Sequence, residues 1–158
     1  MRILALAFAI GAVLTAQKYS GPRPPKPDVP YLLHASTLIS TDVDEAKEDK
    51  RKDGTAYITT GAAAKARTPL AEPIFLFETK SIPPERLSLY KLEVKGGSRE
   101  VFFFDNVKKR RDSAKSLRLS ATKVAQGLYR LEPTDPLPNG EYGISPADSN
   151  TVFSFTIY

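Results

Sequence analysis

The chain has no cysteine and no tryptophan, and His34 is its only histidine in 158 residues. The lack of cysteine excludes disulfide bonds, cysteine nucleophiles and thiolate-bound zinc ions. A serine–histidine–aspartate site would depend on His34, which lies in the apolar segment 31–35. No nucleophile elbow, phosphate-binding loop or histidine metal motif accompanies it. We therefore interpret His34 as a strand residue and predict no catalytic residue, no cofactor and no metal ion.

Long apolar runs are also scarce, and the one that exists lies at the N-terminus, from Ile3 to Leu14. It is too short for a stable membrane span, which needs about 20 apolar residues. Arg2 before the run and Ala16 after it complete the layout of a secretory signal peptide over residues 1–16. We expect a secreted or periplasmic protein, and an uncleaved N-terminal anchor is the alternative.

A large excess of one charge is missing as well, because 23 basic residues stand against 18 acidic ones. A net charge of +5 lies within the range that keeps a small domain soluble. Nucleic-acid-binding domains carry a stronger and more clustered excess of basic residues. Together with the export signal, this argues against nucleic acid as a partner.

Prolines, in contrast, concentrate in one short segment, with five of them between Gly21 and Pro30. Such a run favours extended polyproline geometry. We predict that residues 17–30 form a semi-rigid tether and that residues 31–158 form a single domain of ordinary size. The alternative for residues 17–30 is a leader without a role of its own.

Helical periodicity is absent from residues 31–158, whereas apolar and polar residues alternate in many short segments. The alternation is clearest near the C-terminus, where Phe153, Phe155 and Ile157 point one way and Ser154 and Thr156 the other. We predict about eight or nine strands in an antiparallel Greek-key β-sandwich, most of them half-buried with one solvent-facing side. Segments 74–77 and 101–104 are apolar on both faces, so each is either a central strand or exposes rings to a partner. The predicted strand segments are 31–39, 55–60, 74–77, 90–95, 101–104, 117–121, 129–132, 142–145 and 153–157.

One short motif narrows the fold class. Leu137, Gly140 and Tyr142 have the spacing L-x-x-G-x-Y in the segment LPNGEY. This spacing resembles the tyrosine corner of immunoglobulin-like domains. The resemblance covers six residues, and it implies that the Tyr142 hydroxyl bonds to backbone a few residues upstream. It implies a fold and no function.

The densest basic cluster is a candidate interaction site, formed by Lys108, Lys109, Arg110 and Arg111. In an exported protein such a patch suits an anionic partner, either a protein or a cell-surface polymer. The alternative is a polar turn between two strands, which would discourage aggregation.

The aromatic triplet Phe102, Phe103 and Phe104 precedes this cluster in the chain. Alternation along a strand sends Phe103 to the face opposite its two neighbours. Either a core covers both faces of the sheet here, or the rings form an aromatic interface for a partner.

Carboxylates give two weaker hypotheses. Asp42, Asp44 and Glu45 could seed a calcium site, although their spacing departs from the twelve-residue calcium loop, so a solvated hairpin tip closing at 53–54 is the preferred interpretation. A glycosidase pair leaves no fixed spacing in sequence. Strand glutamates that could supply such a pair are Glu78, Glu93, Glu100 and Glu141.

These observations favour a non-enzymatic, extracytoplasmic β-sandwich module for binding or assembly at the cell envelope. Copies could also pair through an open edge strand to form a homo-oligomer. The alternatives are a small outer-membrane β-barrel, which 142 residues after the signal would allow, and a carboxylate-based extracytoplasmic hydrolase.

Overall fold

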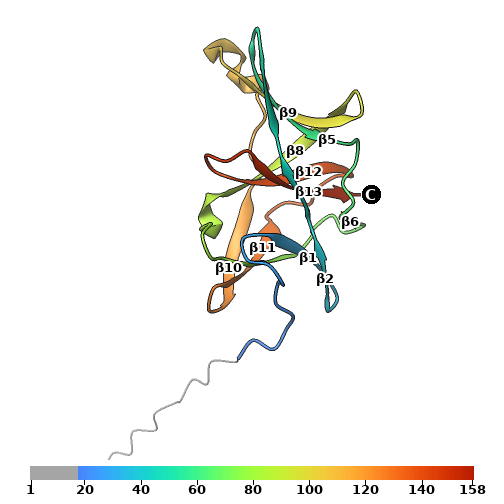
Figure 1. Cartoon of the computed structure of the whole chain (residues 1–158), viewed down its shortest axis with the longest axis vertical. Coiled ribbons are helices and arrows are strands. Elements are labelled where there is room, and N and C mark those ends of the chain that lie inside the picture. Colours follow the sequence, from blue (N-terminus) through green and yellow to red (C-terminus); the bar gives the residue numbers. More distant parts are fainter. Residues whose placement is uncertain (1–17) are drawn as a thin grey trace, which may run out of the picture.

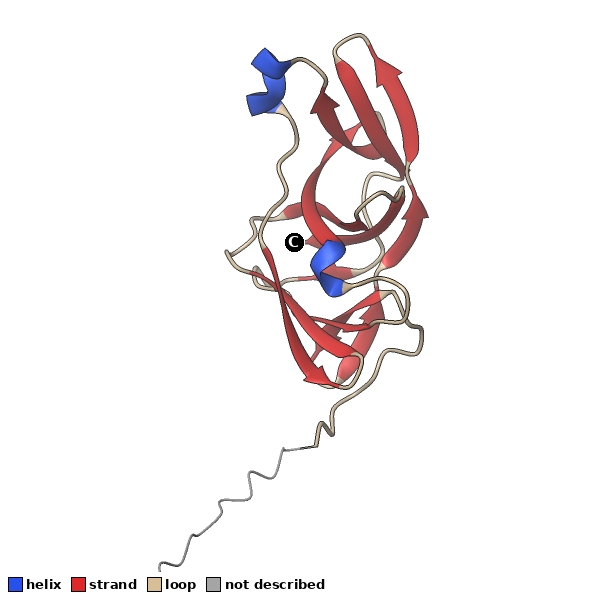
Figure 2. Cartoon of the chain, turned by 90° about the vertical axis from the view of Figure 1, so that its left-hand side faces the viewer, coloured by secondary structure: helices blue, strands red, loops and turns tan. Residues whose placement is uncertain are grey.

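The computed structural model describes residues 18–158, so the predicted signal peptide, residues 1–16, lies outside the described residues. This part of the chain is all-β, with antiparallel sheets and two short 3₁₀ helices (Figures 1 and 2). No helix in it is long and apolar enough to cross a membrane. The strands are β1 (Pro30–His34), β2 (Thr37–Ser40), β3 (Asp42–Glu45), β4 (Lys47–Arg51), β5 (Gly54–Thr60), β6 (Arg67–Thr68), β7 (Phe75–Glu78), β8 (Leu87–Lys95), β9 (Ser98–Phe104), β10 (Leu119–Ala125), β11 (Leu128–Pro133), β12 (Gly140–Pro146) and β13 (Thr151–Ile157). The helices are η1 (Pro84–Arg86) and η2 (Val107–Asp112).

The prediction of about eight or nine strands is too low, because thirteen strands form between residues 18 and 158. The predicted strand 31–39 is a hairpin, β1–β2, in which Ala35 takes a positive φ of 52°. Alanine rarely adopts that conformation, so the sequence gives no turn signal there. Strands β3 and β4 form within the charged segment 42–51, where backbone pairing does not depend on apolar alternation.

Strands β10, β11, β7, β1 and β2 form a five-stranded sheet in that order. Its central strand, β7, carries Phe75, Leu76 and Phe77, which are all buried. A strand covered on both faces reads as a continuous apolar run, as this segment does.

The second sheet has eight strands, in the order β3-β13-β12-β8-β9-β5-β4, with β6 parallel to β13. Its two ends, β3 and β4, are separated in the chain only by Ala46, which is buried. The Ala46 N–H donates to the carbonyl of Asn150 at 2.7 Å. Because consecutive strands form its two ends, this sheet returns on itself, and we call it the rolled sheet.

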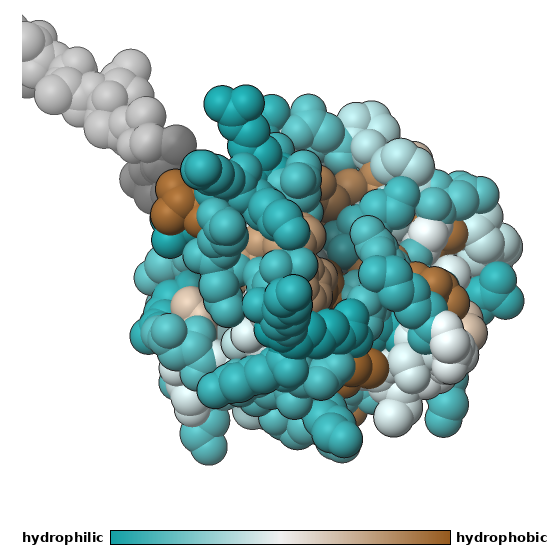
Figure 3. All heavy atoms as spheres, turned by 90° about the horizontal axis from the view of Figure 1, so that it is seen from above, coloured by the Kyte–Doolittle hydropathy of each residue, from teal (hydrophilic) through white to brown (hydrophobic). Residues whose placement is uncertain are grey.

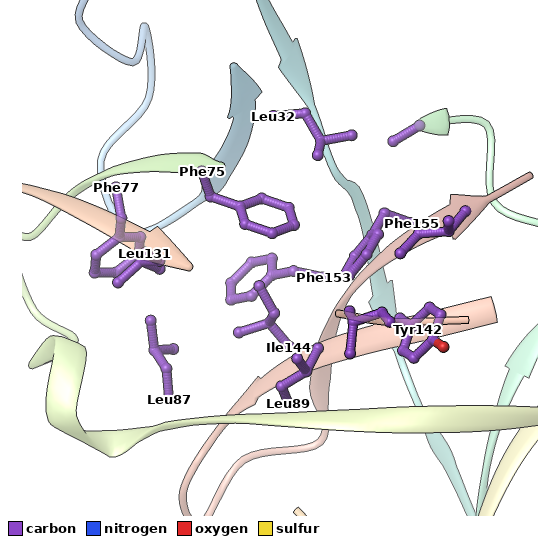
Figure 4. Packing of buried hydrophobic residues seen from close by; sticks show 13 residues of the cluster. Leu32, Phe75, Phe77, Leu87, Leu89, Leu131, Tyr142, Ile144, Phe153 and Phe155 are labelled. Carbon is purple, nitrogen blue, oxygen red and sulfur yellow. The ribbon is translucent and has the colours of Figure 1, made fainter. Parts of the chain in front are cut away.

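The main core lies between the five-stranded sheet and strands β8, β12 and β13 of the rolled sheet (Figure 4). Phe153, Phe155 and Ile157 point into it, as their alternation predicts. The prediction that the opposite side of this strand faces solvent is wrong, because Ser154 and Thr156 are also buried. They face the interior of the rolled sheet, where Asp44 and Glu141 bond to them.

The segment LPNGEY forms a tight corner at the start of β12. The Tyr142 hydroxyl donates to the carbonyl of Pro138 at 2.6 Å, four residues upstream, which is the contact that the resemblance implies. Gly140 has a φ of +154°, which residues with a side chain rarely adopt. Leu137 is buried and joins the core cluster.

The proline-rich segment is bound to the domain over its second half. Pro24 is buried, and the Asp28 carboxylate accepts the backbone N–H groups of Lys80, Ser81 and Ile82 at 2.8–3.1 Å. Burial alone would raise the pKa of Asp28, but these three donors outweigh it and lower the pKa. Residues 18–23 leave the body at the end opposite η2 (Figures 1 and 2).

Candidate functional site

The aromatic triplet lies on β9, in the part of the rolled sheet that extends beyond the five-stranded sheet (Figure 1). Phe102, Phe103 and Phe104 are all half-buried, and none belongs to the core cluster. The main core therefore covers neither face of β9 at the triplet. The two faces differ in their surroundings.

Phe103 points into the rolled sheet. Its ring meets Tyr57 of β5 and Tyr90 of β8 edge-on, with ring centroids 5.9 and 5.8 Å apart. This arrangement is the favoured geometry for aromatic pairs. Phe103 is therefore a wall of an internal space and not part of the outer surface.

Phe102 and Phe104 point outward and pack edge-to-face, with centroids 4.8 Å apart. Arg51 lies over the Phe102 ring at 5.7 Å, and Lys109 lies over the Phe104 ring at 5.8 Å. Each cation–π contact of this exposed kind is worth about 0.5–1 kcal/mol. The result is a surface on which apolar rings and cations alternate.

Strand pairing brings Arg51 to this surface. Arg51 is opposite Gly54, and Gly54 is opposite Phe104, so the three residues lie side by side across β4, β5 and β9. A side chain at Gly54 would place its Cβ only 2.0 Å from the carbonyl oxygen of Phe103. Glycine thus permits the close approach of β5 and β9. The sequence contains no motif that would have predicted the contact between Arg51 and the rings.

The basic cluster forms η2, directly after β9. The turn expected between two strands is a 3₁₀ helix, in which the Asn106 side chain accepts the Lys108 N–H at 2.9 Å. Lys109 pairs with Asp53 at 3.2 Å. In the described part of the chain, Lys108, Arg110 and Arg111 form no ion pair, and all three are exposed.

Glu100 compensates part of the charge beside this cluster. Its side chain is 6% exposed, and it accepts two hydrogen bonds from Arg51, at 3.1 and 2.8 Å, and one from Lys95 at 2.9 Å. The bonds from Arg51 are the main reason why the pKa of Glu100 falls to about 2. A carboxyl with this pKa stays ionised and cannot serve as a general acid.

The other strand glutamates have different surroundings. Glu93 is the cross-strand partner of Glu100 and shares Lys95 with it. Glu78 pairs with Arg23 at the opposite end of the molecule. Glu141 is buried and accepts from the Ala64 N–H and the Thr156 hydroxyl.

The three carboxylates of the calcium hypothesis bind separate partners. Asp42 accepts the backbone N–H groups of residues 65 and 66, Asp44 pairs with Arg99, and Glu45 accepts the Thr151 hydroxyl. Within residues 18–158, no three metal-ligating side chains gather. The charged segment does form a hairpin, β4–β5, that turns at residues 52–53.

His34 lies in β1, and its Nε2 is 3.1 Å from the Thr68 hydroxyl. It is half-buried and has no acidic partner in the described part of the chain. This is the arrangement of a strand histidine with one hydrogen bond.

The elements of the candidate site therefore meet at one end of the molecule. We call the surface made by Arg51, Phe102, Phe104 and residues 108–111 the basic–aromatic end. In the view onto this end, hydrophilic residues cover most of the surface and hydrophobic atoms are visible between them (Figure 3). Compared with known proteins, the chain matches no family model, no curated protein and no solved structure.

Proposed function

We propose that this chain is an exported, non-enzymatic binding module that holds an anionic polymer of the cell envelope at its basic–aromatic end. The observation that carries the proposal is a set of three exposed cations, which have no ion-pair partner among residues 18–158, beside two half-exposed phenylalanine rings. Free cations attract an anionic partner without first breaking an internal ion pair.

The rings give the surface a second mode of contact. Phe102 and Phe104 can pack against the apolar faces of a polymer while the neighbouring cations bind its acidic groups. An open apolar patch rimmed by charge is typical of an interaction surface. A polar turn that only prevented aggregation would not need the rings.

The position of the proline-rich segment supports the same function. Residues 18–23 leave the molecule at the end opposite η2 (Figure 2). If residues 17–30 act as a tether, the basic–aromatic end points away from the attachment. This orientation suits a module that reaches for a partner.

We further propose that the fold is an immunoglobulin-like sandwich in which the rolled sheet supplies one layer. The bond between Tyr142 and Pro138 supports it, as does the core shared by β1 and β7 with β8, β12 and β13. Two packed antiparallel sheets and a tyrosine corner are features of this class.

Binding of the purified protein to immobilised heparin, used as a sulfated polysaccharide probe, tests the proposal. We expect retention that weakens as salt rises, because screening shortens the reach of exposed charges to about 8 Å at physiological ionic strength. Changing Lys108, Lys109, Arg110 and Arg111 together to Ser should abolish it.

A matched control removes the same charge from the other end of the molecule, through Ser at Lys18, Lys26, Lys80 and Lys123, which are all exposed. We expect this variant to keep most of the retention. Equal losses in the two variants would show that only net charge matters, and an unchanged η2 variant would also refute the proposed site.

A further inference from the structure

The interior of the rolled sheet holds a cavity of about 230 Å³, partly open to solvent beside residues 148–150, on the face opposite the main core. Its walls come from five strands that pair side by side, in the order β13, β12, β8, β9 and β5. Tyr57 lies opposite Val101, and Tyr90 lies opposite Gly143. The walls that matter for binding are Tyr57, Tyr90, Leu92, Val101, Phe103 and Val152.

Gly143 shapes one side of this space. A Cβ at this position would lie 2.6 Å from Cγ1 of Val152, so any larger residue here would displace the valine from its place against β12. Aliphatic and aromatic side chains share the remaining wall, since β8 contributes Tyr90 and Leu92, and β9 contributes Val101 and Phe103.

A charged layer closes one end of the interior. Arg99 and Glu141 each lie two residues before a cavity residue on the same strand face, because side chains alternate along a strand. Asp44 of β3 joins this layer through its ion pair with Arg99. Arg99 is 2% exposed and donates to the carbonyls of Thr60 at 2.8 Å and Gly61 at 3.0 Å.

The charges in this layer are turned towards one another. The Arg99 guanidinium lies 3.4 Å from the Asp44 carboxylate and 3.9 Å from the Glu141 carboxylate. At the other end, Asp148 is the one charged residue on the lining, and it pairs with Arg86 at 2.6 Å. No unpaired charge of this lining calls for a charged ligand, because burying an ion without a partner is costly.

We propose that this cavity binds a small neutral aromatic molecule of one or two rings with a hydroxyl or carbonyl substituent. An apolar cavity of about 150 Å³ already takes up benzene, and this one is larger. The three rings can contact an aromatic guest edge-to-face, which is the geometry in which Tyr57 and Tyr90 each meet Phe103.

We expect a polar substituent on the ligand because of the hydroxyl groups of two tyrosines. Within residues 18–158, neither Tyr57 nor Tyr90 makes a side-chain hydrogen bond to another residue. Both phenol groups are therefore free to bond to a ligand. The site is independent of the basic–aromatic end, since Phe103 and Phe104 point to opposite faces of β9.

Fluorescence titration with 2-naphthol tests the proposal, because the chain lacks tryptophan and its tyrosines leave the probe's signal undisturbed. We expect saturable binding of one molecule per chain. The anionic analogue 2-naphthalenesulfonate should bind at least about tenfold more weakly, since its charge finds no partner in the cavity.

Two variants locate the bound probe. Ser88 lines the cavity, is half-buried and makes no side-chain hydrogen bond in the described part of the chain, so Ser88→Phe fills the space without removing a bond. We expect it to abolish binding while the melting temperature is unchanged or higher. Phe103→Ala should also abolish binding, and Phe104→Ala, its neighbour on the outer face, is the matched control that keeps it.

Several outcomes would overturn the proposal. One is that 2-naphthol shows no saturable binding to the folded protein. Others are that Ser88→Phe binds 2-naphthol as tightly as the wild type does, or that 2-naphthalenesulfonate binds as tightly as 2-naphthol. Sedimentation of the wild type as a dimer that the probe dissociates would identify a second copy of the chain as the occupant. Because the heparin experiment does not involve the cavity, the two proposals fail separately.

Discussion

At the residue scale, Tyr142 stabilises the domain through both parts of its side chain. The residue is fully buried, and its ring stacks on Phe155 with centroids 5.5 Å apart. Its hydroxyl satisfies the carbonyl of Pro138, which lies at the start of the corner. Burial raises the pKa of Tyr142 above its ordinary value of 10.0, so its hydroxyl remains a donor at neutral pH and into the alkaline range.

We predict different costs for the two halves of this side chain. Tyr142→Phe keeps the ring and removes one hydrogen bond, so it should lower the free energy of unfolding by about 1 kcal/mol. Tyr142→Ala also empties part of the core and should cost about 3–5 kcal/mol. Denaturant unfolding measures both, and equal small losses would show that the ring is not part of the core.

At the scale of elements, Glu100 joins three strands of the rolled sheet. It sits on β9 and binds Arg51 of β4 and Lys95 of β8. These bonds hold the hairpin β4–β5 and the end of β8 against the strand that carries the aromatic rings. The geometry of the basic–aromatic end therefore depends on a carboxylate that does not belong to it.

We predict that this junction weakens in acid. The pKa of Glu100 is about 2 in the folded protein, against an ordinary value of 4.5. Between these values the unfolded chain binds the proton more readily, so stability present above pH 4.5 is lost as the pH falls towards 2. Glu100→Gln should cost about 1–3 kcal/mol at neutral pH and flatten this part of the pH profile.

The control for this prediction is Glu93→Gln, which changes the cross-strand partner that shares Lys95. Its side chain is 71% exposed, so we expect a change of at most about 0.5 kcal/mol. Chemical denaturation between pH 2 and 7 measures all three proteins. A wild type and a Glu100→Gln variant that lose stability in parallel would contradict the assignment.

Alternation in the sequence identified those strands that face the main core. Phe153, Phe155 and Ile157 lie where their spacing predicts, and β7 is a central strand, as its apolar run indicates. Alternation failed on the polar faces, because Ser154 and Thr156 look like solvent-facing residues and are buried. The polar face of a strand becomes buried only when the sheet curls back on itself and other strands provide hydrogen-bonding partners for that face.

Those partners are far away in the chain, which explains why the sequence does not predict them. Arg99, Asp44 and Glu141 come from three separate segments and meet only through the register of β9, β3 and β12. Ala46 lets β3 continue into β4 and thereby closes the sheet, yet an alanine between two charged segments gives no signal of this role. The cavity and the cation–π contact between Arg51 and Phe102 also depend on how the strands of the rolled sheet pair.

At the scale of the whole molecule, the two ends carry different features. The proline-rich segment binds one end through Pro24 and Asp28, and the basic–aromatic end lies at the other (Figure 1). The main core and the rolled sheet lie between them. Nearly the full length of the domain would therefore separate a ligand bound at η2 from residues 18–23.

We predict that the direction of attachment decides whether a surface-bound protein captures heparin. The chain has no cysteine, so one introduced cysteine gives a single coupling point. Ser20→Cys lies in the proline-rich segment and Val107→Cys lies at the start of η2; both positions are exposed and uncharged. Protein coupled through residue 20 should capture heparin as the soluble protein does, whereas coupling through residue 107 should block the basic–aromatic end and remove most of the capture.

Both variants must bind heparin like the wild type before coupling, which excludes an effect of the substitutions themselves. Equal capture in the two orientations would place the binding surface elsewhere on the molecule, because only a site at the η2 end is covered by one attachment and presented by the other.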